Sequence, residues 1–236
     1  MRTRRAVACL LVAAAALTAC ATQADLDGDD RTAAERRADE AAAKRMLLTI
    51  DDLPAGFRAG PVDEGDDAGV TGFDADVARC LHVSPDRLDS DSPKAASPTF
   101  STADDSTEIT AEVTFTPSTR SAAGTMDVYQ SDAAPRCYEQ AFRRELAKQP
   151  ARPGVELGDP SLDRLDVPDV GDETVAFRVS VRLSGGGLHI PLYFDVLLVR
   201  VGRIGITMTF ATQREPFDPG EAAELARVVA DRAPAS

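Results

Sequence analysis

The chain lacks tryptophan and has only two histidines among its 236 residues. Aromatic residues make up 5% of it, so few rings are available to stack against sugars. A Ser-His-Asp or Cys-His site needs a histidine, which leaves only His82 and His189 as candidates. No G-x-S-x-G, S-x-x-K, H-E-x-x-H or P-loop pattern occurs. We therefore expect a protein that is not an enzyme.

A hydrophobic stretch long enough to cross a membrane is also absent. The apolar run AVACLLVAAAAL, residues 6–17, is shorter than the roughly 20 residues of a membrane-spanning helix. It follows the arginines of MRTRR and precedes the small residues of TAC, the organisation of an export signal. Leu17-Thr18-Ala19-Cys20 resembles the lipobox of bacterial lipoproteins.

The lipobox resemblance implies that residues 1–19 are a signal peptide and that Cys20 becomes the first residue of the mature protein. It also implies a diacylglycerol on the Cys20 sulfur, and two acyl chains hold a protein stably on a membrane. We expect anchoring at the extracytoplasmic face of the cell membrane. The alternative is an ordinary cleaved signal followed by an incidental cysteine.

The four cysteines then have separate fates. Cys9 leaves with the signal and Cys20 carries lipid, so Cys80 and Cys137 remain in an oxidising compartment, where one disulfide is the simplest outcome. Such a bond stabilises a fold by about 4 kcal/mol in chain-entropy estimates. Neither cysteine lies in a CxxC, and we expect no metal and no cofactor.

Charge excludes a further class of partner. Without the signal, 39 acidic residues face 23 basic ones, which gives a formal charge of −16. Such a surface repels nucleic acid and anionic headgroups, so we expect no nucleic-acid binding. Solubility explains the acidity most simply, and a basic partner or dissolved cations are the alternatives.

The N-terminal part of the mature chain reads as a tether. Residues 21–31 are polar and acidic, and Thr32-Ala-Ala-Glu35 is a capping box that begins a helix extending to about Leu48. Leu53-Pro54 then ends helical structure. We assign residues 20–45 to the lipidated cysteine and a partly helical tether, and residues 46–236 to a single domain.

The rest of the chain predicts an α+β fold. Apolar residues alternate in TEITAEVTFTP, which predicts a strand preceded by a short one near residues 98–102. Helices are expected around Cys80, at 118–131, at 133–148 and after Asp218. Alternation and turns predict a three-stranded antiparallel meander over residues 175–210. We expect a sheet of about five strands with helices on one face and one disulfide.

Three segments carry a family resemblance: LLTIDDLPAGF at residues 47–57, Pro135-Arg136-Cys137 in a central helix, and the closing meander with its helix. They look like a broad group of actinomycete lipoproteins that is similar to extracellular sensor domains of envelope kinases, some members being PsbP-like in fold. The resemblance runs from about residue 46 to the end. It implies an envelope location and ligand or partner binding. Such sensor domains commonly carry two disulfides, whereas this chain provides for one.

The meander contains a candidate binding patch. Arg178, Ser180 and Arg182 share one face of a strand, and the neighbouring strand presents His189, Tyr193 and Asp195 on one face. If the two faces coincide, guanidinium groups there are suited to an anionic ligand or an acidic partner. Alternatively, the arginines pair with local Asp and Glu.

The favoured function is a lipid-anchored, non-catalytic protein of the cell envelope that binds an unidentified ligand or protein partner, in the manner of a sensor domain. A second hypothesis is a carrier of an apolar, lipid-like ligand between sheet and helices. The run Val196-Leu197-Leu198-Val199 is apolar on both strand faces, which fits a two-sided core or a cavity lining. A third hypothesis is an envelope hydrolase that depends on His189.

Overall fold

The centre of the molecule is the antiparallel meander that the alternating sequence predicted. In the computed structural model, which describes residues 29–60, 73–88, 91–148 and 154–234, it comprises β7 (Glu173–Gly185), β8 (Leu188–Val201) and β9 (Ile204–Gln213). Gly186 and Gly187, with φ of 58° and 80°, form the tight turn between β7 and β8. β4 (Thr107–Phe115) pairs with β9 along its whole length.

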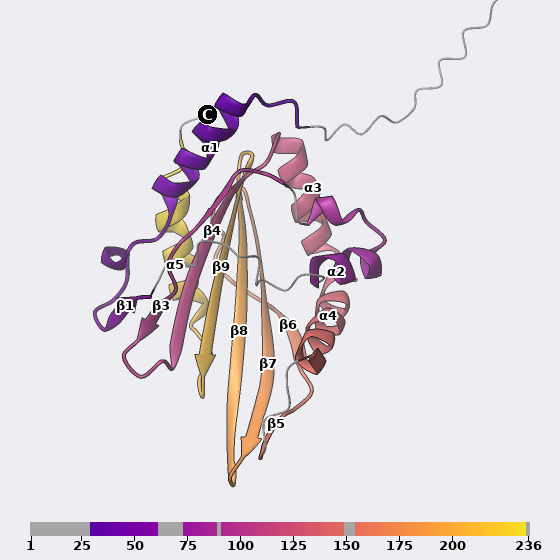
Figure 1. Cartoon of the computed structure of the whole chain (residues 1–236), viewed down its shortest axis with the longest axis vertical. Coiled ribbons are helices and arrows are strands. Elements are labelled where there is room, and N and C mark those ends of the chain that lie inside the picture. Colours follow the sequence, from indigo (N-terminus) through magenta and orange to yellow (C-terminus); the bar gives the residue numbers. More distant parts are fainter. Residues whose placement is uncertain (1–28, 61–72, 89–90, 149–153, 235–236) are drawn as a thin grey trace, which may run out of the picture.

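Short strands extend this centre into one sheet. Its order is β1-β3-β4-β9-β8-β7-β5, with β2 also paired to β4 and β6 to β7 (Figure 1). The additional strands are β1 (Phe57–Ala59), β2 (Lys94–Ala96), β3 (Phe100–Thr102), β5 (Val155–Leu157) and β6 (Ser161–Leu165).

The predicted α+β class, the antiparallel sheet and the disulfide are confirmed, and the sheet is larger than the five strands expected. Sequence reasoning missed β1, β2, β5 and β6. These segments are too short to show a period of two, and backbone pairing to a longer neighbour makes them strands.

Helices cover both faces of the sheet, whereas the sequence predicted one. α1 (Ala33–Met46) and α5 (Pro219–Ala230) lie on one side, and α2 (Phe73–Leu81), α3 (Thr119–Gln130) and α4 (Ala134–Lys148) lie on the other (Figure 1). The pattern of β8 accounts for this. Leu197 packs in the core with α1 and α5, and Leu198 packs with α3 and α4.

We call the side under α1 and α5 the closed face. Every second residue of β4 and β9 points to it, including Ile109, Ile206, Met208 and Phe210, each at most 1% exposed. α5 contributes Ala223, Ala226 and Val229, all 0% exposed. The other side, onto which Gly205, Thr207 and Thr209 of β9 point, we call the open face.

α1 belongs to this core and not to a tether. Its Ala43 and Met46 are 0% and 1% exposed. The predicted capping box of Thr32 and Glu35 is present, and the helix ends at Met46, two residues earlier than expected. The packed domain therefore begins well before residue 46. The sequence did not indicate this, because α1 is rich in charged residues and buries only a few apolar ones.

A cluster of charges fixes the entry to α1. Asp39, 7% exposed, accepts hydrogen bonds from Arg203 (2.5 and 3.0 Å) and from Arg31 (2.8 Å). Arg31 also donates to the backbone oxygen of Phe115 at 2.8 Å. Burial raises the pKa of the Asp39 carboxyl, but the bonds from the two arginines outweigh burial and the pKa lies below its ordinary value. We call Arg31, Asp39 and Arg203 the N-terminal clamp. Cys20 lies outside the described residues.

Candidate functional site: a cleft on the open face

The strand faces of the predicted patch do coincide. Arg178 lies opposite Asp195, and Ser180 lies opposite Tyr193, all on the closed face beyond the apolar core. The Arg178 guanidinium donates to both Asp195 oxygens at 2.7 and 2.5 Å and to the backbone oxygen of Phe217 at 2.8 Å. Asp195 is 5% exposed.

The charge of Arg178 is therefore used inside the protein. The Asp195 carboxylate raises the pKa of the Arg178 guanidinium, and the guanidinium also lies 5.8 Å from the centre of the Tyr193 ring. Arg182 pairs in the sheet with Pro191 and is exposed. The local pairing that the sequence left as an alternative thus accounts for one of the two patch arginines.

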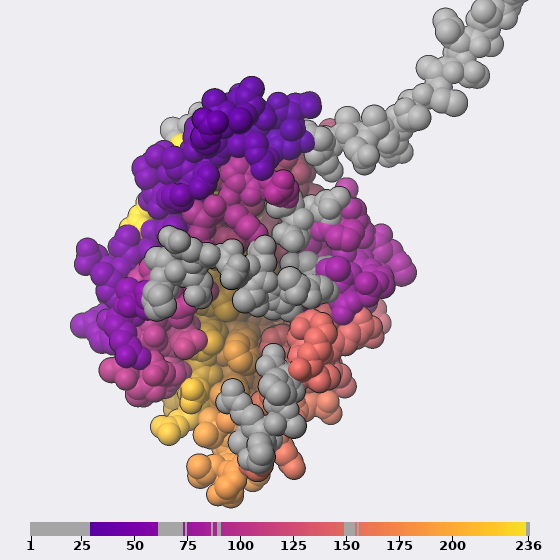
Figure 2. All heavy atoms as spheres, viewed as in Figure 1, coloured from indigo at the N-terminus to yellow at the C-terminus, as the bar shows by residue number. Residues whose placement is uncertain are grey.

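His189 lies at the tip of the β7–β8 hairpin. Its Nδ1 is 2.9 Å from the Ser184 hydroxyl, which is the contact of a nucleophile with a base. Both residues belong to the hairpin end, which forms the narrow tip of the molecule opposite α1 (Figure 2). No carboxylate hydrogen-bonded to the His189 ring is found among the residues described.

Two other features are absent from these described ranges. Among the described residues, no group of three His, Cys, Asp or Glu side chains is close enough to hold a metal ion. Likewise, none of the helices in these ranges has the length and apolar character needed to span a bilayer.

The open face carries a hollow between the sheet and its helices. A cleft of about 860 Å³ lies between the sheet and the helices on this side. Its floor comes from β4, β9, β8 and β7, and its walls come from α2, α3, α4 and the 3-10 turn Pro85–Arg87. Most of the lining is apolar, and polar side chains cluster on two of the floor strands.

The floor changes character between β9 and its neighbour β8. In register, Thr207 lies between Glu112 of β4 and Leu198 of β8, and Thr209 lies beside Val196 of β8. Strands β4 and β9 therefore present hydroxyl and carboxyl groups, whereas β8 and β7 present aliphatic and aromatic side chains. This division follows from the sequence, because threonine and glutamate alternate on this face of β4, Thr207 and Thr209 lie on that of β9, and mostly apolar residues occupy that of β7 and β8.

Aromatic rings line the apolar part of the cleft. Tyr138 of α4 lies at the centre, with ring centroids 5.8 Å from Phe73, 5.7 Å from Tyr129 and 5.9 Å from Phe177. Tilted and offset pairs at these distances are favourable. Each of these residues except Phe177 is half-buried, so part of each ring faces the hollow.

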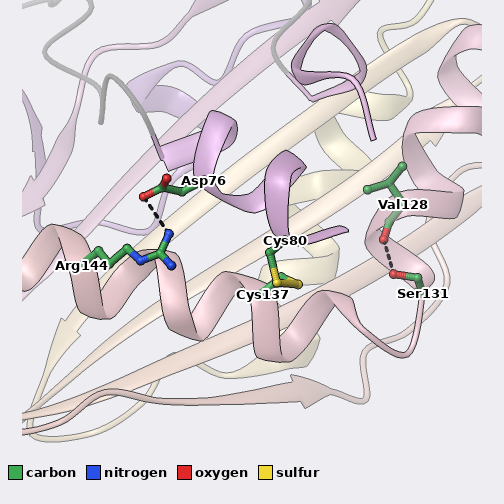
Figure 3. Close-up of a disulfide and its surroundings, with 6 residues drawn as sticks. All are labelled: Asp76, Cys80, Val128, Ser131, Cys137 and Arg144. Atoms are coloured by element: carbon green, nitrogen blue, oxygen red, sulfur yellow. Dashed lines mark hydrogen bonds and ion pairs between the residues drawn. A yellow bond between two sulfur atoms is a disulfide. The ribbon is translucent and has the colours of Figure 1, made fainter. Parts of the chain in front are cut away.

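The disulfide holds α2 as a wall of the cleft. Cys80 of α2 and Cys137 of α4 are bonded, with their Cα atoms 5.6 Å apart, and Arg144 of α4 pairs with Asp76 of α2 at 3.3 Å (Figure 3). Hydrogen bonds from Arg79 and Arg144 lower the pKa of the Asp76 carboxyl. α2 thereby presents Phe73 to the hollow from a fixed position.

Comparisons with known proteins leave the chain without a family. No protein-family model matches it, and no curated protein matches it. Solved structures with a similar fold include the extracellular domain of PknH from Mycobacterium tuberculosis, at 10% identity and a TM-score of 0.44, covering 82% of this chain and 95% of that one.

Two more solved structures are similar at still greater distance. An uncharacterized protein from Mycobacterium smegmatis, the Rv0999 ortholog, has 12% identity and a TM-score of 0.38 over 83% of this chain and 96% of its own. LpqN of Mycobacterium tuberculosis, described as involved in cell envelope biogenesis, has 13% identity and a TM-score of 0.24 over 78% and 79%. Similarity this distant assigns neither a family nor a function.

The predicted patch and the cleft lie on opposite faces of β7 and β8. Sequence reasoning identified the two-faced apolar run of β8, which divides as expected: Leu197 and Val199 enter the core, and Val196 and Leu198 line the cleft. It did not single out Glu112, Thr207 and Thr209, because their alternation with apolar residues predicts only strands. The signal present in the sequence was a set of polar residues at alternate positions of two segments: Thr110, Glu112, Thr114, Thr207 and Thr209.

Proposed function

We propose that this protein is a non-catalytic component of the cell envelope, held at the membrane through Cys20, and that it binds a small ligand in the cleft of the open face. The cleft itself is the observation that supports the proposal. Its volume of about 860 Å³ and its apolar, aromatic lining with a few polar groups are typical of ligand pockets. Packing helices against this sheet does not require a hollow, because α1 and α5 fill the space above the closed face.

The other candidate functions have less support. Capture of an acidic partner by the meander patch relies on Arg178, whose guanidinium is already bound by Asp195 and Phe217. Hydrolysis relies on His189, which contacts Ser184 at the hairpin tip and lies away from the cleft lining.

Ligand binding is tested with N-phenyl-1-naphthylamine, an uncharged dye that fluoresces in apolar sites. We use the mature chain, residues 20–236 with Cys20→Ser, which carries no acyl group and contains every described residue. The dye is expected to bind, and Val196→Phe, which fills the apolar half of the cleft, is expected to abolish its fluorescence. Leu188→Phe, which adds the same ring at a site 65% exposed on the hairpin, is the control. Equal fluorescence in both variants contradicts the proposal.

Native mass spectrometry of the protein released from its own membranes provides a second measurement. A bound small molecule that is present in the unsubstituted chain and missing from Val196→Phe supports the cleft as its site. Anchoring is tested separately: Cys20→Ala is expected to leave uncleaved or released protein, and an unchanged membrane fraction contradicts it.

A further inference from the structure

The proposed function does not specify the chemical class of the ligand. The division of the cleft floor into a polar and an apolar half indicates which class fits. We propose that the cleft selects an amphiphile whose apolar chain lies over β8 and β7 beneath α3 and α4, and whose uncharged, hydroxyl-bearing head lies over β4 and β9. This inference rests on the proposed function, because it names the ligand class of the same site.

The apolar half of the cleft suits a chain or a flat apolar group. Leu198 and Phe177 pack with Met126 of α3 and Ala134 of α4 in a buried cluster that borders this half, and the half-buried Val196 lines the hollow beside it. Phe142 of α4 and Phe194 of β8 add a ring pair at 5.7 Å. Placing a chain here removes apolar surface from water at roughly 0.8 kcal/mol per CH₂ group.

The polar half suits hydroxyl groups. A threonine hydroxyl both donates and accepts hydrogen bonds, as does a hydroxyl of the ligand. Thr207 and Thr209 are half-buried, lie on the same face of β9, and have no side-chain hydrogen bond recorded in the described structure. Gly205 extends this strip, and a Cβ built on it meets no atom within 4 Å, which leaves room for a head group above the strand.

The charged lining residues favour a head without net charge. Glu112 of β4 and Lys94 of β2 carry opposite signs and lie two positions apart in register on the same face. Arg200 is already paired with Asp172 at 3.0 Å and with Glu173 at 2.9 Å. Neighbouring opposite charges offset each other, so this half selects neither sign and does not offset the cost of removing an ionic head from water.

Three amphiphiles with the same eight-carbon apolar chain separate the head groups: octyl glucoside, nonanoate and octyltrimethylammonium, each below its micelle concentration. Binding to the mature chain is followed by calorimetry and by tyrosine emission, since the chain has no tryptophan. Tyr193→Phe removes the one tyrosine outside the cleft lining. Octyl glucoside is expected to bind about tenfold more tightly than either ion, and glucose alone is expected not to bind.

Substitutions place the head on β9. The double variant Thr207→Val, Thr209→Val keeps the shape of the floor and removes two hydroxyls, so the affinity for octyl glucoside is expected to fall about tenfold, while dye binding persists. Thr207→Ser, Thr209→Ser retains the hydroxyls and is expected to keep the affinity. Thr107→Val, on β4 outside the cleft lining, is the control, and urea midpoints verify that each variant is folded.

The outcomes separate the two proposals. Binding of nonanoate or octyltrimethylammonium as tightly as octyl glucoside, or an affinity unaffected by the double valine variant, overturns the head-group inference and leaves ligand binding intact. Dye binding without binding of any of the three amphiphiles does the same. If neither the dye nor an amphiphile binds, the proposed function fails as well.

Discussion

The two faces of the sheet differ in side-chain type and in packing, although the same strands form both. On the closed face, β4 and β9 present isoleucine, methionine and phenylalanine, and α1 and α5 fill the space above them. On the open face, the intervening residues of the same strands are threonine, glutamate and glycine, and a cleft of about 860 Å³ remains. Alternate residues of the same strands thus form a packed interior on one face and a hollow on the other, because successive side chains point in opposite directions.

The largest expected effect is a difference in stability between substitutions at two adjacent residues of β9, one on each face. Phe210→Ala, on the closed face, removes a ring that is 0% exposed and lies 4.4 Å from the ring of Phe217. It is expected to lower the free energy of unfolding by about 3–5 kcal/mol, since the core cannot refill the volume. Thr209→Ala, on the open face, is expected to change it by less than about 0.5 kcal/mol. Urea unfolding measures both, and similar losses contradict the distinction.

Removing the disulfide tests how the open face is held. Replacing Cys80 and Cys137 together with serine is expected to cost about 2–4 kcal/mol in urea unfolding. The bond joins α2 to α4, so the same variant is expected to bind the dye more weakly under conditions where circular dichroism shows it to be folded. Dye binding equal to that of the disulfide-bonded chain means that α2 keeps its place without the bond.

The two patch arginines provide a matched pair within β7. Arg178→Ala leaves the Asp195 carboxylate buried without its charged donor and is expected to cost about 1.5–3 kcal/mol. Arg182→Ala, on the same strand face and exposed, is expected to cost less than about 0.5 kcal/mol. Thermal unfolding distinguishes them, and a cost at Arg182 equal to that at Arg178 indicates a partner for Arg182 inside the fold.

The smallest expected effect is a loss of stability at low pH through Asp29, which lies just before α1 on the closed face. Hydrogen bonds from Arg31 lower the pKa of the Asp29 carboxyl from 3.8 to about 2. Because the folded-state pKa is depressed, the stabilisation is present above pH 3.8 and is lost as the pH falls towards 2. The effect is modest, since solvent reaches Asp29. Asp29→Asn is expected to flatten the loss of stability over this interval, and an unchanged acid profile contradicts it.

The sequence was sufficient for the long elements. Alternation predicted β4, β7, β8 and β9, and the caps Thr32 and Asp218 marked two helix starts, because these features depend on neighbours along the chain. Layering was harder. Helices on both faces follow from the two-sided burial of β8, which the sequence showed as a run of four apolar residues without stating what covers each side.

The cleft could not be predicted from the sequence alone. Its lining combines β2, β4, the meander and three helices, so no single segment of sequence contains its pattern. The threonines of β9 look like an ordinary hydrated strand surface until α3 and α4 are seen to stand over the adjacent strands. The pairing of Arg178 with Asp195 was foreseeable as an alternative, since the two residues are opposite each other in the hairpin.

The disulfide also bears on the order of folding. The covalent ring from Cys80 to Cys137 contains β2, β3, β4 and α3, but β9, the long partner of β4, begins only at Ile204. Oxidation of these two cysteines can thus precede completion of the sheet. It then restricts the loop that contains β4 before β4 meets its partner about 100 residues away, a type of contact that is slow to form. The rate of refolding from the oxidised chain, compared with the reduced one, measures the effect of that restriction.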